Sequence, residues 1–228
     1  MKFPIEVEAV AFDLDGTLVE TLPDLHESAN RMLARLGMPP AGEAVVRAYI
    51  GDGVDRLVKR LLTGSSDGEP EAALFERAVA DFRAHYAQLL THASHPFAGA
   101  AETLDLLRVR GAKLACVTNK PARFTGPLLA GLGLARRLDL VLSGDSLPQK
   151  KPSAMPLAHA AAAFGIAPAR LLMVGDSAVD CGAARAAGCP VVCVPYGYRG
   201  TMGVQELDCD AIVPTLSDLP DLIRIPHS

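Results

Sequence analysis

Six short apolar runs, most of them rich in β-branched residues, constrain the fold of this 228-residue chain most strongly. Over most of the sequence they alternate with helix-like stretches, three of which end at a glycine suited to a helix C-terminus (Gly111, Gly165 and Gly188). Such alternation favours an α/β fold with a parallel sheet covered by helices on both faces. The runs are VEAVAFDL (7–14), AKLACVT (112–118), LDLVLS (138–143), RLLMVG (170–175), PVVCV (190–194) and DAIV (210–213).

Residues 20–92 interrupt this alternation with three successive helical patterns, at 23–37, 51–64 and 70–90. The stretch HASHPFAGA (92–100), with Pro and Gly, reads as a joint back into the alternating pattern. We therefore predict a discontinuous sheet domain of residues 1–19 and 93–228, interrupted by a helical insertion of residues 20–92. An insertion directly after the first strand is expected to form a lid over the carboxyl end of that strand.

Composition and charge exclude several classes of partner. The net charge is −4 and no basic stripe is present, which argues against nucleic acid as a partner. No window approaches the ~20 apolar residues of a membrane span, and the start MKFPIEVEAV lacks the pattern of a signal peptide. The five cysteines show no CxxC pair or zinc spacing, so we expect buried free thiols in a reducing cytoplasm.

Polar residues cluster directly after the predicted strands. Ligands of open parallel sheets bind outside the carboxyl ends of the strands, so these residues mark a site. Clustered carboxylates repel one another unless they bind something, and hard oxygen ligands suit a Mg²⁺ ion that bridges to a phosphate. The residues are Asp13, Asp15 and Thr17 after the first run, Thr118, Asn119 and Lys120 after the second, Lys150 and Lys151 after the third, and Asp176, Ser177 and Asp180 after the fourth.

The spacing of Asp13 and Asp15 suits phosphoryl transfer. Residues i and i+2 of an extended segment project on the same face, and Gly16 lets the chain turn away. One aspartate can then attack phosphorus, while the other protonates the leaving oxygen and later activates water. A calcium loop is the rival interpretation of DxDG, but Leu18 and Asp24 replace the glycine and glutamate that it needs.

Four segments resemble, in order, the four motifs of the haloacid dehalogenase superfamily: DLDGTL (13–18), VTNK (117–120), KKP (150–152) and GDSAVD (175–180). The likeness covers essentially the whole chain. Within the superfamily it is strongest to bacterial phosphoglycolate phosphatases, through segments such as YIGDGVDRLVKRLL and VPYGYRG. The resemblance implies a Rossmann-like sheet with an inserted all-helical cap, a Mg²⁺ cofactor and an aspartyl-phosphate intermediate.

The resemblance also implies roles for the residues of the first two motifs. Asp13 is the expected nucleophile and a metal ligand. Asp15 is the expected acid/base and offers its backbone carbonyl to the metal. Thr118 and Asn119 are expected to bind the phosphoryl group.

The last two motifs complete the implied site. Lys151 is expected to stabilise the charge of the phosphoryl group, and Asp176 to bind Mg²⁺. Asp180 is expected to support the metal directly or through water, with the N-cap of the following helix as its alternative role. Lys120 and Lys150 are expected to be solvated neighbours of Asn119 and Lys151.

The helical insertion supplies candidate substrate contacts at Gly51, Gly53, Arg56 and Arg60. The arginines could bind a substrate carboxylate, although a helix face that carries Arg56, Lys59 and Arg60 is equally typical of a solvated surface.

The sequence therefore predicts a Mg²⁺-dependent phosphatase of a small phosphomonoester, with 2-phosphoglycolate as the preferred substrate. A phosphatase of a sugar phosphate such as N-acetylmuramic acid 6-phosphate, a phosphomutase and a non-catalytic phosphate-binding module are alternatives. Asp15 argues against a dehalogenase, which resembles this chain less because it lacks the second aspartate. A monomer or homodimer is expected.

Overall fold

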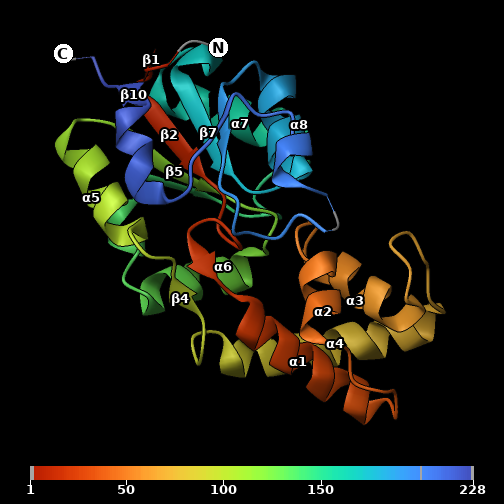
Figure 1. Ribbon diagram of the computed structural model, residues 1–228. Coiled ribbons are helices and arrows are strands. Elements are labelled where there is room, and N and C mark those ends of the chain that lie inside the picture. The colour runs from red at the N-terminus through yellow and green to blue at the C-terminus, as the bar shows by residue number, and fades with distance from the viewer. Residues whose placement is uncertain (1–2, 201, 227–228) are drawn as a thin grey trace.

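The computed structural model describes residues 3–200 and 202–226. A six-stranded sheet with strand order β6-β5-β2-β7-β8-β9 forms its centre, and all of its neighbouring strands are parallel (Figure 1). Each of the six apolar runs supplies one strand, which confirms the predicted α/β fold. The strands are β2 (Ala9–Phe12), β5 (Lys113–Val117), β6 (Leu140–Leu142), β7 (Leu171–Gly175), β8 (Val191–Cys193) and β9 (Ala211–Ile212).

Helices cover both faces of the sheet, as the sequence predicts. Ala9 and Ala11 of β2 pack with α7 (Met155–Phe164) and α8 (Ala178–Ala187), where small side chains allow helix and sheet to approach closely. Val10 and Phe12 of the same strand face the opposite cluster. The elements on that side include α5 (Ala100–Val109), α6 (Ala122–Gly131) and the 3₁₀ helix η4 (Leu216–Asp221).

Helices α1 to α4 form a separate group beyond the carboxyl end of β2 (Figure 1). The sequence predicts three of them but misses α2, whose seven residues EAVVRAY are too short and too β-branched to give a clear helical period. The four are α1 (Leu22–Arg35), α2 (Glu43–Tyr49), α3 (Val54–Thr63) and α4 (Ala72–Leu89). The domain boundaries after residue 19 and before residue 93 stay predictions.

Two small strand pairs, neither expected from the sequence, lie outside the main sheet. β3 (Val19–Glu20) pairs antiparallel with β4 (His95–Pro96), so the two strands that connect the sheet to the helical group lie side by side. β1 (Ile5–Glu6) pairs in parallel with β10 (Ile223–Arg224), which brings the two ends of the described chain together (Figure 1). Three short 3₁₀ helices complete the described structure: η1 (Ala135–Arg137), η2 (Pro168–Arg170) and η3 (Val204–Glu206).

All five cysteines lie within the described residues as free thiols. Four are buried as predicted, whereas Cys209 is partly exposed. None of the helices in the described part of the chain has the length and hydropathy that crossing a bilayer requires.

The order of the strands determines where a ligand can bind. The chain passes from β2 to β5 and β6 on one side of the sheet, and from β7 to β8 and β9 on the other. The adjacent strands β2 and β7 therefore flank a topological switch point, where the loops diverge and leave a crevice outside the carboxyl ends. Asp13 follows β2 and Asp176 follows β7, so both lie at this crevice.

Candidate functional site

Asp13 stands at the end of β2 and is held by backbone and side-chain contacts. Its N–H donates to Val174 O at 2.9 Å, which continues the ladder between β2 and β7. Oδ1 accepts the Leu14 N–H at 2.7 Å and lies 2.9 Å from Nζ of Lys151. Burial raises the pKa of Asp13 to about 6, although the ammonium of Lys151 opposes the rise.

Lys151 joins the nucleophile candidate to a second aspartate. Its Nζ lies 2.7 Å from Oδ1 of Asp180, and the side chains of Lys151 and Asp180 are 2% and 0% exposed. Burial alone would lower the pKa of Lys151, but the two carboxylates outweigh burial and raise the pKa above its usual value. Lys151 is therefore a permanent buried cation at the predicted phosphoryl site.

Asp180 is not the N-cap of α8. Ser177 is the N-cap, and Asp180 lies three residues on, where its Oδ2 accepts the Ser177 N–H at 3.1 Å in a capping box. The same oxygen accepts the Ser177 hydroxyl at 2.7 Å and the Asp176 N–H at 3.2 Å. Because Oδ1 pairs with Lys151, both carboxylate oxygens of Asp180 have partners. In this structure Asp180 holds Lys151 and the loop that carries Asp176 in place.

Asp176 is fixed from two sides. Thr17, from the loop after β2, donates its hydroxyl to Oδ1 at 2.8 Å, and the backbone N–H of Tyr198 donates to Oδ2 at 2.5 Å. Burial, together with Asp180 and Asp13, raises the pKa of Asp176 well above its usual value despite these two donors. Gly16 makes the close approach of the loop possible, because it adopts φ +88° and a Cβ there would lie 2.8 Å from Asp176 Oδ2.

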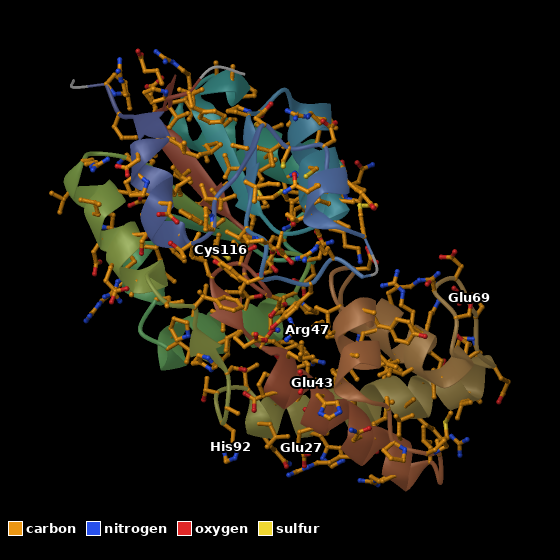
Figure 2. The ribbon with its side chains drawn as sticks, in the orientation of Figure 1. Glu27, Glu43, Arg47, Glu69, His92 and Cys116 are labelled. Carbon is orange, nitrogen blue, oxygen red and sulfur yellow. The ribbon has the colours of Figure 1, made fainter. Side chains whose placement is uncertain are left out.

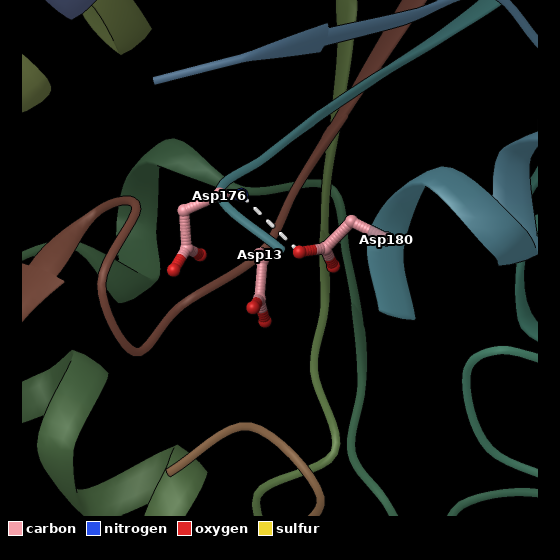
Figure 3. A group of neighbouring side chains, drawn as sticks. All are labelled: Asp13, Asp176 and Asp180. Carbon is pink, nitrogen blue, oxygen red and sulfur yellow. Dashed lines mark hydrogen bonds between the residues drawn. The ribbon is translucent and has the colours of Figure 1, made fainter. Parts of the chain in front are cut away.

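Asp13, Asp176 and Asp180 form a group that fits a metal ion (Figure 3). Each offers one carboxylate oxygen, and these oxygens all lie within 4.8 Å of one another. Burial first, and the neighbouring carboxylates second, raise the pKa of Asp13 and of Asp176, and a divalent cation would offset both effects. Hard oxygen ligands of this kind suit Mg²⁺. The carboxylate of Asp15 does not belong to this group but pairs with Lys120. The predicted contact of the Asp15 backbone carbonyl with the metal stays a prediction.

Thr118 and Asn119 lie at the end of β5 and line the site. The Thr118 hydroxyl accepts the Lys120 N–H at 3.1 Å. The Asn119 amide donates to Gly51 O at 3.1 Å and to Lys151 O at 3.0 Å. Asn119 thus connects the helical insertion to the loop that carries Lys151, and its predicted phosphoryl contact stays a prediction.

Gly51 and Gly53 bring the helical insertion down onto the sheet. A narrow cavity of about 20 Å³ lies between the two parts of the chain. Gly53 adopts φ +90°, and a Cβ at this position would lie 3.1 Å from Asn119 O. The residues that line the cavity are Asp13, Asp15, Gly51, Gly53, Thr118, Asn119 and Lys120.

Arg56 and Arg60 are not among the described residues that line this cavity. Arg56 donates to Glu69 at 3.0 Å and to Asp67 at 2.8 Å, and Glu69 lies at the outer edge of the helical group (Figure 2). Arg60 pairs with Asp52 at 2.6 Å. This arrangement favours a role for both guanidinium groups in stabilising the loops of the insertion.

The two lysines expected to be solvated behave differently. Lys150 is exposed, and its Nζ donates to Asp52 O at 2.6 Å. Lys120 is buried, which corrects the prediction: its Nζ lies 2.8 Å and 3.2 Å from the two carboxylate oxygens of Asp15. It also donates to the hydroxyl of Tyr86 on α4 at 2.6 Å. Burial behind the docked helix α4 is the physical reason for the difference.

Sequence reasoning missed two tyrosines near the site. Tyr86 gives no signal, because a buried aromatic residue on an amphipathic helix usually indicates core packing. Tyr198 lies in the VPYGYRG segment, whose pattern indicates no role for this residue in the site. Its backbone holds Asp176, and its hydroxyl accepts the N–H groups of Thr21 and Leu22 at 2.9 and 3.0 Å and donates to Glu20. The loop after β8 therefore connects the carboxylate group of Asp13, Asp176 and Asp180 to the start of α1.

Comparison with known proteins agrees with this geometry. A phosphoglycolate phosphatase of Thiobacillus denitrificans is 51% identical over 217 residues, which is 95% of this chain and 96% of the relative. One of Nitrosospira multiformis is 50% identical over 224 residues, 98% of this chain and 99% of that protein. The crystal structure of a predicted phosphoglycolate phosphatase from Haemophilus somnus 129PT has a TM-score of 0.89 at 35% identity, over 94% of this chain and 96% of that one.

The match to a family model is equally extensive. The model of the haloacid dehalogenase-like hydrolases matches residues 7–188, a range that includes all four motifs. Together with relatives near 50% identity over almost the full chain, this match confirms the predicted enzyme class. The chain belongs to the haloacid dehalogenase-like hydrolases.

Proposed function

We propose that this protein is a Mg²⁺-dependent phosphatase that hydrolyses a small phosphomonoester, with 2-phosphoglycolate as the preferred substrate. The observation that carries the proposal is the different environment of two neighbouring aspartates. Asp13 lies against Lys151 within the carboxylate group that fits a metal, whereas Asp15 lies against Lys120 at the same narrow cavity. Two carboxylates in different environments can divide the roles of nucleophile and acid/base.

In the proposed reaction, a carboxylate oxygen of Asp13 attacks phosphorus while the bond from phosphorus to the leaving oxygen breaks. Asp15 gives its proton to that oxygen, so the alcohol leaves neutral. Asp15 then takes a proton from water as the water oxygen attacks phosphorus, which releases phosphate and restores the Asp13 carboxylate. In both steps the ammonium group of Lys151 stabilises the negative charge on the phosphoryl oxygens.

Asp13 and Asp176 are the proposed ligands of Mg²⁺, with Asp180 in support. When bound, the ion neutralises phosphoryl charge and aligns the phosphoryl group with the nucleophile. The free thiols of all five cysteines support the proposal that the enzyme works in the reducing cytoplasm.

The preference for 2-phosphoglycolate rests on the names of the relatives at 51% and 50% identity. A sugar phosphate is the second candidate, because a larger cavity of about 440 Å³ adjoins the narrow one and shares Gly53 and Asn119 with it. The lining of this larger cavity carries three cationic side chains, Arg83, Arg123 and Lys150, and three carboxylates, Asp52, Asp55 and Asp145, a polar surface suited to the hydroxyl groups of a sugar.

A panel of phosphomonoesters, assayed with and without Mg²⁺, tests the proposal. We expect Mg²⁺-dependent release of phosphate, with the highest kcat/KM for 2-phosphoglycolate. Faster turnover of N-acetylmuramic acid 6-phosphate would favour the second candidate. Conversion of a sugar phosphate to its isomer without release of phosphate would favour a phosphomutase, and binding without turnover would favour a phosphate-binding module.

A further inference from the structure

The ammonium group of Lys120 has three N–H donors, and the structure provides a partner for each. Oδ1 and Oδ2 of Asp15 lie 2.8 and 3.2 Å from Nζ, and the hydroxyl oxygen of Tyr86 lies 2.6 Å from it. The side chain of Lys120 is 1% exposed and that of Asp15 is 15% exposed. These contacts leave the ammonium little freedom to rotate, so the carboxylate of Asp15 is held in one orientation.

Tyr86 belongs to the helical insertion but is packed against the sheet domain. It is fully buried, and its ring lies 5.0 Å from that of Phe124 on α6 and 5.8 Å from that of Phe82 on α4. Nζ of Lys120 also lies 4.6 Å from the centre of the Tyr86 ring, within the range of a cation–π contact. Lys120 is thus fixed from the insertion by the hydroxyl group of one tyrosine.

We infer that Lys120 and Tyr86 are positioning residues for Asp15, and that the docked insertion thereby sets the geometry of proton transfer. This inference rests on the proposed function, in which Asp15 is the acid/base. Asp13 needs no such device, because Lys151 and the Leu14 N–H already hold it from the sheet side. The insertion therefore does more than cover the site: through Tyr86, which lies 34 residues before Lys120 in the sequence, it helps to orient the acid/base Asp15.

The dependence on leaving group separates this role from a purely structural one. An alkyl leaving group needs a proton from Asp15 as its bond to phosphorus breaks, whereas p-nitrophenolate departs without one. The ratio kcat/KM reports the steps up to transfer of the phosphoryl group to Asp13. A displaced Asp15 should therefore lower kcat/KM for an alkyl ester far more than for p-nitrophenyl phosphate.

The test compares Lys120→Met and Tyr86→Phe with wild type on two substrates: p-nitrophenyl phosphate, and the alkyl ester that the wild type hydrolyses best. For Lys120→Met we expect a loss of about 10²-fold on the alkyl ester, since acid/base assistance is typically worth about 10²–10⁴. The loss on p-nitrophenyl phosphate should be at least about tenfold smaller. Tyr86→Phe, which keeps the ring, should shift the same ratio in the same direction by less.

Matched controls are Lys113→Met, an exposed lysine at the opposite end of β5, and Tyr49→Phe on α2 of the insertion. Both should leave the ratio of the two substrates unchanged. Equal losses on both substrates, or no loss, in folded Lys120→Met and Tyr86→Phe would overturn the inference and leave the phosphatase proposal standing. A wild type that hydrolyses neither substrate would overturn the proposed function and the inference with it.

Discussion

The Nζ atom of Lys151 lies 2.7 Å from Oδ1 of Asp180, and this ion pair is almost completely inaccessible to solvent. The same ammonium lies 2.9 Å from Asp13. One buried cation therefore compensates two carboxylates, and one of these belongs to the capping box at the start of α8. The centre of the site and the stability of the fold depend on the same contact.

Removing this cation should destabilise the protein. Lys151→Met leaves Asp13 and Asp180 without their counter-charge, and breaking a buried pair typically costs about 3–5 kcal/mol. We expect a loss of this size in the free energy of unfolding, measured by urea denaturation. Lys150→Met is the matched control. Lys150 is adjacent to Lys151 but exposed, so its replacement should change stability by less than about 0.5 kcal/mol. Equal losses for the two variants would contradict the burial argument.

Metal binding should be visible without any assay of activity. A ligand that binds the folded state alone raises stability, by about 2.7 kcal/mol at a hundred times its Kd. We expect Mg²⁺ to raise the Tm of the EDTA-treated wild type but not that of Asp176→Asn. Asp67→Asn, at an exposed position, should respond like wild type. A Tm that is indifferent to Mg²⁺ in the wild type would remove the proposed metal site.

Catalytic turnover should depend on Mg²⁺ in the same way as the Tm. EDTA should abolish phosphate release, and Mg²⁺ should restore it. Ca²⁺ should support little turnover, because it is larger and takes more ligands than this site offers. Full activity after dialysis against EDTA would argue against a metal-dependent reaction.

Replacing Gly53 with alanine should lower activity, because the added methyl group would press against Asn119 O at the site. Gly53→Ala and Gly64→Ala both place alanine at a positive φ, +90° and +66°, but a Cβ at Gly64 meets nothing within 4 Å. Both variants should lose about 1 kcal/mol of stability. Only Gly53→Ala pushes the insertion away from Asn119 O, so we expect its kcat/KM to fall about tenfold, since small misplacements are costly. A similar fall in Gly64→Ala would show that strain alone is responsible.

Arg56 and Arg60 offer a test between two interpretations of the insertion. The guanidinium of Arg56 pairs with the exposed Asp67 and Glu69, and that of Arg60 with the partly buried Asp52. Ion pairs near the surface are worth about 0–1 kcal/mol. We therefore expect alanine at either position to change KM for 2-phosphoglycolate and for p-nitrophenyl phosphate by equal, small factors. A selective rise in KM for 2-phosphoglycolate would instead support the carboxylate contact expected from the sequence.

The strands and the cluster of polar residues at their ends could be predicted because both follow from local patterns. Apolar runs identify β2 and β7, and parallel strands bring their carboxyl ends to one edge of a sheet. Asp13 and Asp176 therefore meet although they are far apart in the sequence. The helix α2 escaped detection because seven residues hold too few turns for a period to be visible.

The environment of Lys120 could not be predicted from the sequence. A lysine after a strand usually extends into solvent, and its burial here requires α4 to dock with Tyr86 directly above it. That contact depends on how the helical insertion sits on the sheet. The same holds for Tyr198, whose backbone N–H meets Asp176 because the loop after β8 folds back over the site.

The central claim is that Asp13 and Asp15 perform different steps, and trapping the intermediate tests it most directly. Asp13→Asn removes the attacking carboxylate, so no covalent adduct should form. Asp15→Asn keeps the nucleophile but loses the base that activates water. Because p-nitrophenolate leaves without a proton, phosphate should accumulate on this variant, as hydrolysis of the adduct slows by about 10²–10⁴.

The measurement is intact-mass spectrometry of each variant after reaction with p-nitrophenyl phosphate and an acid quench, in which an acyl phosphate survives briefly. The account predicts one added phosphoryl group on Asp15→Asn, mapped to the tryptic peptide that contains Asp13, and none on Asp13→Asn. Steady turnover by Asp13→Asn, or an adduct on any other residue, would contradict it.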